Sequence, residues 1–283
     1  MRDSFCVFIL SHGRPDRVYT YKSIRNIGYT GDIRILVDDQ DKTLPEYIER
    51  YGDEVVVFCK QESADETDAG DNFKEMRSVI YARNANFKIA KNLGYRYFLQ
   101  LDDDYTSFYY RYGKDKKFGS FALRVTGDAV FNAFIDFLKN TPATCIAMSQ
   151  GGDHYGPSNL RLLRKAMNSF FCDVERPFKF VAKMNDDVST YLVLGKQGRL
   201  FFTTMQVQLN QMPTQSNSGG LTDIYLAMGT YVKSFYSVIY APSCVKISTL
   251  QGRDPRKESH ARIHHKINWQ AAVPKILRAS WRK

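Results

Sequence analysis

Short apolar runs alternate with amphipathic stretches along the first hundred residues of the chain. Several of the runs have the length of buried strands, at residues 5–10, 33–37, 55–58 and 97–101. Between them the apolar positions recur at helical spacing, which predicts helices at residues 18–27, 44–51 and 73–93. This alternation of strands and helices predicts a parallel sheet with right-handed crossovers.

The second half of the chain has a less regular pattern. Its apolar positions predict helices at residues 128–139, 187–196 and 222–232, and strand-like segments at residues 144–149, 170–183 and 236–247. Polar composition predicts loops that start at residue 151 and at residue 212, and a mobile acidic loop at residues 61–72.

These elements predict an α/β fold with a Rossmann-type, mostly parallel sheet flanked by helices. No internal repeat or low-complexity linker interrupts the chain, so we expect a single domain over residues 1–283. Residues 1–105 would form its regular half. Residues 106–283 would form an irregular half that ends in a basic tail.

Composition narrows the class of protein. Apolar residues make up 43% of the chain, enough for a sizeable core, and no apolar run reaches the length of a membrane span. The short N-terminal apolar run lacks the cleavage pattern of a signal peptide. The five scattered cysteines predict reduced core residues in a cytoplasmic protein, with no disulfide framework or structural zinc site.

The net charge of +10 is unevenly distributed along the chain. Residues 251–283 hold nine Lys or Arg against Asp254 and Glu258, so this tail alone carries +7. This positive charge predicts a polyanionic partner such as nucleic acid. A solvated basic helix that aids solubility is the alternative.

Three adjacent carboxylates follow the predicted strand at residues 97–101. Ligands of open α/β sheets bind outside the carboxyl ends of the strands, and carboxylate oxygens suit Mg²⁺ or Mn²⁺. We therefore expect Asp102 and Asp104 to bind a metal ion, with Asp103 beside the ligand. A solvated acidic turn would show the same triplet.

Polar side chains also follow the other predicted strands. Their order is the one that a nucleotide diphosphate ligand needs, and they are Ser11, His12, Gly13 and Arg14 after the first strand, Asp38 and Asp39 after the second, and Arg83 and Asn84 in the helix before the triplet. Each group also has an ordinary explanation: a loop contact, a turn or a surface patch.

A second acidic cluster, Asn185-Asp186-Asp187, begins a predicted helix, where the helix dipole stabilises carboxylates. It supplies a general base or merely caps the helix. Three of the five histidines lie within residues 260–265, where an imidazole such as that of His264 could complete a metal shell or contact nucleic acid.

This order of motifs resembles the GT-A glycosyltransferases. In that resemblance Asp102-Asp103-Asp104 matches the DxD motif, and Asn185-Asp186-Asp187 matches the xED-type pair with Asp in place of Glu. The resemblance implies a nucleotide-sugar and metal half at residues 1–105, Mn²⁺ or Mg²⁺, and a UDP-linked donor. It also implies Asp187 as the base, Asp186 beside it, and His264 as a third metal ligand.

The chain more closely resembles the phage glycosyltransferases associated with TET-type dioxygenases. The Ser-His-Gly-Arg-Pro segment, the Ser218-Gly219-Gly220-Leu221 loop and the basic C-terminus carry this resemblance. It implies 5-hydroxymethylcytosine in DNA as acceptor, in the host cytoplasm. Tyr109 and Arg111, with Ser218, Gly219 and Gly220, are the expected acceptor residues, although core or lid packing also explains the aromatic ones.

The expected chemistry is a direct displacement that inverts the anomeric centre. Asp187 would take the proton of the acceptor hydroxyl. A glycan or protein acceptor is one alternative, and a nucleic-acid-binding module on a degenerate transferase fold is another. A nucleotidyltransferase also uses paired carboxylates with Mg²⁺, but the xED-like helix disfavours it. A retaining outcome, which would need a different geometry, is the stereochemical alternative. The sequence does not predict the sugar, its nucleotide or the oligomeric state.

Overall fold

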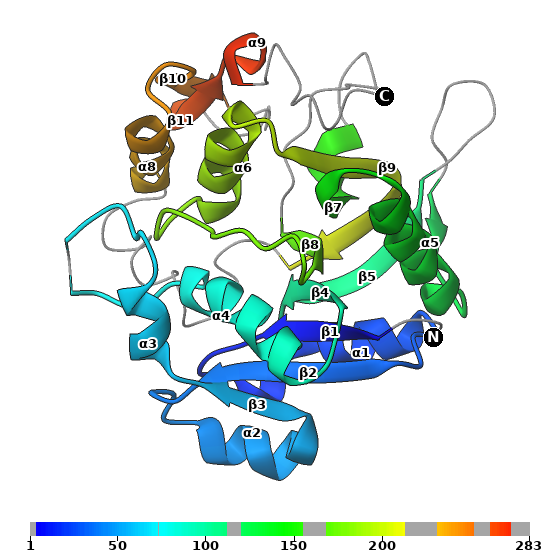
Figure 1. Cartoon of the computed structure of the whole chain (residues 1–283). Coiled ribbons are helices and arrows are strands. Elements are labelled where there is room, and N and C mark those ends of the chain that lie inside the picture. The colour runs from blue at the N-terminus through cyan, green and yellow to red at the C-terminus, as the bar shows by residue number, and fades with distance from the viewer. Residues whose placement is uncertain are drawn as a thin grey trace.

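The computed structural model describes residues 4–72, 74–111, 120–154, 168–212, 231–251 and 261–272. Within them the chain folds around a nine-stranded mixed sheet of order β3-β2-β1-β4-β8-β7-β9-β5-β6, with a separate pair β10-β11 (Figure 1). The strands are β1 (Phe5–Leu10), β2 (Asp32–Asp38), β3 (Val55–Phe58), β4 (Tyr97–Asp102), β5 (Tyr105–Tyr110), β6 (Phe121–Ala122), β7 (Ala143–Gln150), β8 (Ser169–Asp173), β9 (Leu200–Gln211), β10 (Val245–Gln251) and β11 (Ala261–Ile267).

The first half of the sheet is parallel. β1 pairs with β2 on one side and with β4 on the other, and β2 pairs with β3. The chain therefore moves outward from β1 to β3 and then returns to the opposite side of β1. This reversal makes the crevice between β1 and β4 the topological switch point, where ligands of open α/β sheets bind.

Helices cover both faces of the sheet. The principal ones are α1 (Tyr19–Asn26), α2 (Leu44–Tyr51), α3 (Lys60–Asp65), α4 (Ile80–Asn92), α5 (Gly127–Asn140), α6 (Asp186–Lys196), α8 (Val232–Tyr240) and α9 (Trp269–Ala272). Short 3-10 turns lie at Pro15–Arg17, Gly52–Glu54 and Gly151–His154. One core packs α1, α2 and α5 against one face through residues such as Ile24 and Phe131, and the other packs α4 and α6 against the opposite face through Phe87 and Leu192.

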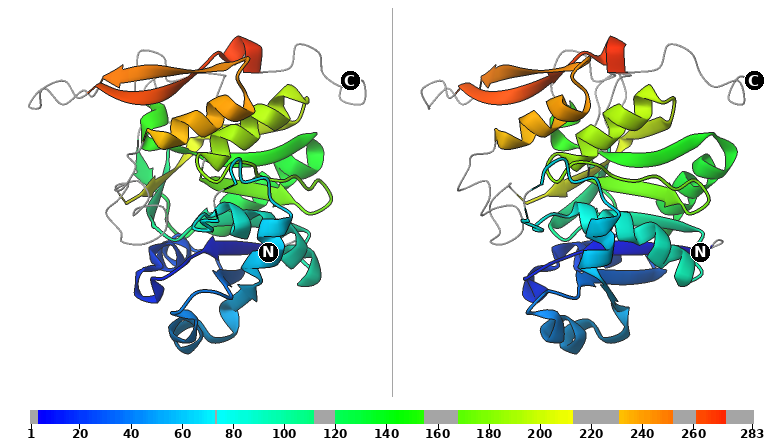
Figure 2. Two further views of the ribbon diagram at one scale, coloured as in Figure 1. Left: turned by 90° about the vertical axis from the view of Figure 1, so that its left-hand side faces the viewer. Right: turned by 60° about the vertical axis from the view of Figure 1, so that its left-hand side comes forward.

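The second half of the sheet is mixed. β8 is antiparallel to β4 and β7, β9 runs parallel to β7, and β5 and β6 complete the edge in antiparallel order. The β10-β11 pair packs against α8 and lies over α6 and α8, at the end of the molecule away from β2 and β3 (Figure 2). The acidic helix α6 is thereby enclosed between the main sheet and this second layer.

The predicted α/β class, with a parallel Rossmann-type first half and helices on both faces, is confirmed. Several predicted elements are wrong in detail. α3 occupies the start of the predicted acidic loop, because Ser63 is buried and its hydroxyl donates to the Tyr81 carbonyl. α4 begins at Ile80, well after residue 73, and the strand predicted at residues 170–183 ends at Asp173.

The segment predicted as a strand from residue 236 begins as a helix, because α8 packs a helical face against α6. Most of the predicted loop at 212–220 and helix at 222–232 lies outside the described residues. All five cysteines are free. No helix in the described ranges is long and apolar enough to cross a membrane.

Candidate functional site

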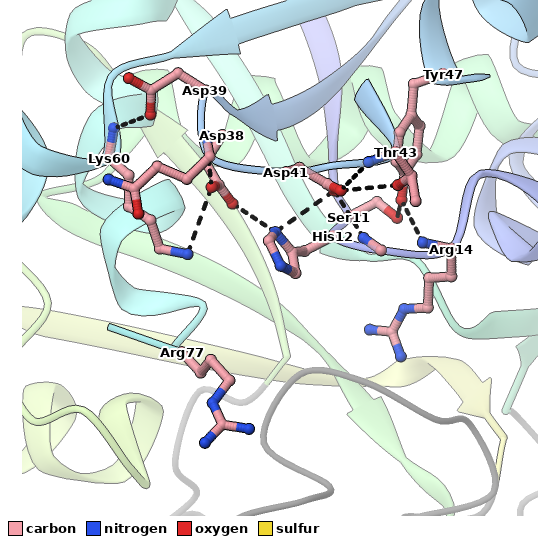
Figure 3. Close-up of polar contacts among 12 residues, drawn as sticks. Ser11, His12, Arg14, Asp38, Asp39, Asp41, Thr43, Tyr47, Lys60 and Arg77 are labelled. Atoms are coloured by element: carbon pink, nitrogen blue, oxygen red, sulfur yellow. Dashed lines mark hydrogen bonds and ion pairs between the residues drawn. The ribbon is translucent and has the colours of Figure 1, made fainter. Parts of the chain in front are cut away.

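The loops after β1, β2 and β3 meet at the carboxyl edge of the sheet (Figure 3). His12 Nδ1 lies 2.7 Å from Asp38 Oδ2, and Lys60 Nζ lies 3.4 Å from Asp38 Oδ1. Burial opposes ionisation of this carboxyl, but the hydrogen bond from His12 and the charge of Lys60 lower the pKa of Asp38 below its usual value. Asp39 accepts a hydrogen bond from the Lys60 backbone at 2.9 Å.

A second group of contacts joins the loop after β1 to the acidic turn, which is Asp102-Asp103-Asp104 at the end of β4. Asp103 is fully buried, and its Oδ2 accepts hydrogen bonds from Ser11 Oγ at 2.5 Å and from Arg14 Nε at 2.8 Å. Gly13 adopts a φ of +71°, and its backbone amide donates to Asp41 Oδ2 at 2.7 Å. Burial raises the pKa of Asp103 although Arg14 opposes the shift. The Asp103 carboxylate therefore anchors the loop, and its predicted contact with the ligand stays a prediction.

Hydrogen bonds from α1 fix the backbone of the acidic turn. Thr20 Oγ1 donates to the Asp102 carbonyl at 2.6 Å and accepts from the Tyr105 backbone amide at 2.9 Å. Burial, and then the charges of Asp102 and Asp103, raise the pKa of Asp104 to about 7. The charge of Arg14 only partly offsets this rise, so a divalent ion would supply further compensating charge.

Arg83 links the acidic turn to the second acidic cluster. Its Nη2 donates to Asp102 Oδ1 at 3.0 Å and its Nη1 donates to Asp186 Oδ2 at 2.6 Å. The guanidinium is buried over the rings of Phe170 and Phe180, at 5.1 and 5.7 Å from their centroids. The two acidic motifs, far apart in the sequence, therefore share one cation.

Asn84 occupies the next position on α4 and holds the chain before α6. Its Nδ2 donates to the Phe180 carbonyl at 3.0 Å, and its Oδ1 accepts from the Phe180 amide at 2.7 Å. Both polar atoms of the Asn84 side chain therefore bind the Phe180 backbone. A direct role of Asn84 in ligand binding stays a prediction.

The second acidic cluster begins α6 in a constrained conformation. Asn185 is left-handed, with a φ of +58°, and donates from Nδ2 to Ser237 Oγ at 2.6 Å. Burial, opposed by Arg83 and reinforced by the charge of Asp187, raises the pKa of Asp186 to about 6. Asp187 is also buried, yet within the described chain its carboxylate has no hydrogen-bond partner. Of the pair, Asp186 is the carboxylate that Arg83 binds, and the role of Asp187 as base stays a prediction.

The histidines of β11 lie beside the second acidic cluster. His265 is buried with its Nδ1 at 3.3 Å from Asn185 Nδ2, and its ring lies 4.2 Å from that of His264. His265 therefore contacts the cluster through Asn185. The metal role of His264 stays a prediction.

No group of three or more His, Cys, Asp or Glu side chains in the described ranges is arranged to hold a metal ion. A site with fewer protein ligands nevertheless fits the residues present. Mg²⁺ is commonly bound through one or two carboxylates together with substrate phosphates. Asp104, whose pKa is raised by burial, and the partly exposed Asp102 supply such a pair.

A polar cavity of about 400 Å³ lies between β5, β9 and the turn after β7. Its lining includes Tyr109, Arg111, His154, Gln208 and Asn210. On β9 the chain reaches Met212, whose amide donates to the Asp104 carbonyl at 3.0 Å. Asn210 is two residues away, roughly 7 Å along the strand. The cavity therefore brings Tyr109 and Arg111 together, five and seven residues along the chain from Asp104.

Some predicted acceptor-side features cannot be placed. Ser218, Gly219 and Gly220 lie outside the described residues, as do residues 252–260 and 273–283 of the basic tail. Sequence reasoning also missed Lys60, Asp41 and Tyr47, which complete the contacts around the β1 and β2 loops. Lys60 could have been found, because it follows the predicted strand at 55–58 just as Asp38 follows its own strand.

The sequence matches the TET-Associated Glycosyltransferase family over residues 5–220. The chain belongs to this family. It is therefore a glycosyltransferase, and the family predicted from the motifs is confirmed. No curated protein matches the chain.

Solved structures resemble this TET-associated glycosyltransferase only at low sequence identity. Glucosyl-3-phosphoglycerate synthase from Mycobacterium tuberculosis, solved with Mg²⁺ and UDP, is 10% identical with a TM-score of 0.49; the match covers 94% of this chain and 88% of that one. S. aureus TarS 1–349, solved with UDP-GlcNAc, is 12% identical with a TM-score of 0.42, covering 83% and 66%. These similarities are weak, and the family match carries the assignment.

Proposed function

We propose that this glycosyltransferase moves a sugar from a UDP-linked donor, with Mn²⁺ or Mg²⁺, to the hydroxyl of 5-hydroxymethylcytosine in DNA. The observation that supports it most is the convergence of polar residues on the β1–β4 crevice, where Arg14 only partly offsets the rise in the pKa of Asp104. A diphosphate with a divalent ion is the kind of ligand that such a carboxyl edge accommodates. The family description points to a hydroxylated base, the product of a TET-type enzyme.

Asp102 and Asp104 would hold the metal ion. When bound, the ion supplies positive charge that offsets the charge developing on the diphosphate leaving group. Ser11 and Arg14 fix the β1 loop against the acidic turn through Asp103, which keeps the turn in one position. Binding of the diphosphate there costs little reorganisation, because the turn is already anchored.

Asp187 acts as the general base of the proposed transfer. Arg83 binds Asp186 and leaves the neighbouring Asp187 carboxylate without a partner among the described residues. The acceptor oxygen forms a bond to the anomeric carbon while the bond from that carbon to the diphosphate breaks, and the hydroxyl proton moves to Asp187. A displacement of this kind inverts the anomeric centre.

The cavity between β5 and β9 supports a base as acceptor. An enzyme that modifies a base must extrude it from the duplex or use a single strand. Tyr109 offers a ring for stacking and Arg111 a cation, both in the lining of the cavity. The net charge of +10 favours a polyanionic acceptor over a neutral glycan or a protein.

Binding of modified DNA at increasing salt tests the acceptor. A single strand with one 5-hydroxymethylcytosine should bind with an affinity that falls steeply as salt rises. Tyr109→Ala should weaken this binding, whereas Tyr110→Phe, a matched change on the same strand that removes the hydroxyl bonded to Thr126, should not. Hydrolysis of UDP-sugar without salt-dependent DNA binding would move the acceptor to a glycan or protein.

A further inference from the structure

The switch point between β1 and β4 divides the carboxyl edge of the sheet into two sides, one at β4 and the other at β2 and β3. A ligand that crosses the β1–β4 crevice places its charged phosphates over the acidic turn after β4. The remaining space for the nucleoside is then on the side of β2 and β3. There, His12, Asp38 and Lys60 form a connected group, with Asp38 between the other two (Figure 3).

Asp38 offers little surface to a base. Its side chain is only 7% exposed. Both carboxylate oxygens are engaged: Oδ2 by His12 Nδ1 at 2.7 Å, and Oδ1 by Lys60 Nζ at 3.4 Å and by the Gln40 amide at 3.2 Å. The Asp38 carboxylate therefore binds the two side chains beside it, His12 and Lys60.

His12 is the exposed member of the group, since 40% of its side chain is accessible. An ionised carboxylate only accepts hydrogen bonds, so the ring nitrogen that faces Asp38, and Asp41 at 3.5 Å, carries the proton. In a neutral imidazole the other nitrogen, Nε2, then has a free lone pair. A neutral His12 ring is thus a hydrogen-bond acceptor at Nε2, in the tautomer that its contact with Asp38 selects.

Lys60 supplies a donor beside this acceptor. Its side chain is 9% exposed, and its amine holds three N–H bonds. In the described part of the chain, Asp38 is its hydrogen-bond partner. Because Lys60 and His12 bind the two oxygens of one carboxylate, the donor and the acceptor lie close together.

We propose that His12, with Lys60, selects the nucleobase of the sugar donor and requires a ring N–H next to a carbonyl group. Uracil, thymine and guanine carry this pair, whereas cytosine and adenine present a ring nitrogen lone pair that would face the lone pair of His12. The inference deepens the proposed function and rests on it, because it needs a nucleoside diphosphate at this edge.

Calorimetric binding of free diphosphates to the full chain with Mn²⁺ tests the proposal without any variant. We compare UDP with N3-methyl-UDP, in which the ring N–H is blocked, and with CDP. Loss of the hydrogen bond to His12, with a methyl group or a second lone pair facing its ring nitrogen instead, predicts at least ~10-fold weaker binding of both analogues. Equal affinity for UDP and N3-methyl-UDP would overturn the role of His12 while leaving the glycosyltransferase assignment intact.

Variants then assign the selection to particular side chains. His12→Phe should bind UDP and N3-methyl-UDP alike, while His12→Gln, which keeps an acceptor oxygen, should recover part of the preference. Lys60→Met should weaken UDP binding, and Lys88→Met, which removes an exposed lysine of α4, should not. An undiminished preference for UDP in His12→Phe would refute the proposal. Failure of every nucleoside diphosphate to bind would instead remove the proposed donor.

Discussion

Replacement of Asp104 by asparagine should stabilise the metal-free protein at neutral pH and at the same time prevent metal-dependent transfer. The pKa of Asp104 is raised from 3.8 to about 7 by burial and by the charges of Asp102 and Asp103. Its ionised form is therefore disfavoured in the folded chain. An asparagine side chain has nearly the same shape and no charge, so the substitution avoids this cost.

The size of the effect follows from the pKa shift. A carboxyl whose pKa is raised on folding contributes stability that is fully present below about pH 4 and is lost as the pH rises through about 7. A shift of about 3 units corresponds to about 4 kcal/mol. Partial solvent exposure reduces this, and we expect roughly 2 kcal/mol between the variant and the unmodified chain at pH 8.

Urea unfolding in the presence of a chelator, at pH 4 and at pH 8, measures this difference. Asp104→Asn should match the unmodified chain at pH 4 and exceed its free energy of unfolding at pH 8. Added Mn²⁺ should stabilise the unmodified chain and leave the variant unchanged. A variant that is no more stable at pH 8, or that Mn²⁺ stabilises equally, would refute the placement of an uncompensated carboxylate at the metal site.

Three further changes test other contacts. Arg83→Met should cost about 3–5 kcal/mol in chemical unfolding, because it leaves Asp102 and Asp186 without their buried cation, and Asp186→Asn in the same chain should recover part of the loss. Asp187→Asn should bind UDP normally but lose at least ~100-fold in transfer; weakened UDP binding would contradict a role as base. Asn84→Ala should cost ~1–3 kcal/mol in a thermal melt, since the Phe180 amide and carbonyl lose their partner, and an unchanged melt would contradict that contact.

The ends of the strands could be predicted from the sequence because each short apolar run stops at a polar residue. Parallel strands bring those ends to one edge, so Ser11, Asp38 and Asp102 were predicted to lie at a common site. The sequence does not say which carboxylate of a triplet faces outward. Only the hydrogen bonds of Asp103 to Ser11 and Arg14 distinguish it from Asp104.

Other features depend on tertiary contacts that no local pattern carries. In β11 neighbouring side chains alternate between faces, so a shift of one residue decides whether His264 or His265 approaches Asn185. The β-branched and aromatic residues around 236–240 favour a strand, but packing against α6 holds them in α8. The link from Arg83 to Asp186 joins positions 103 residues apart.

Mass spectrometry of nucleosides, from DNA incubated with the full chain, Mn²⁺ and a panel of nucleotide sugars, would show directly whether DNA is the acceptor. We expect a sugar-sized mass gain on 5-hydroxymethylcytosine with a UDP-linked donor, none on cytosine, and none with Asp187→Asn. Unmodified DNA under conditions in which the chain consumes the donor would contradict a DNA acceptor, and the sugar would then be sought on a glycan or protein.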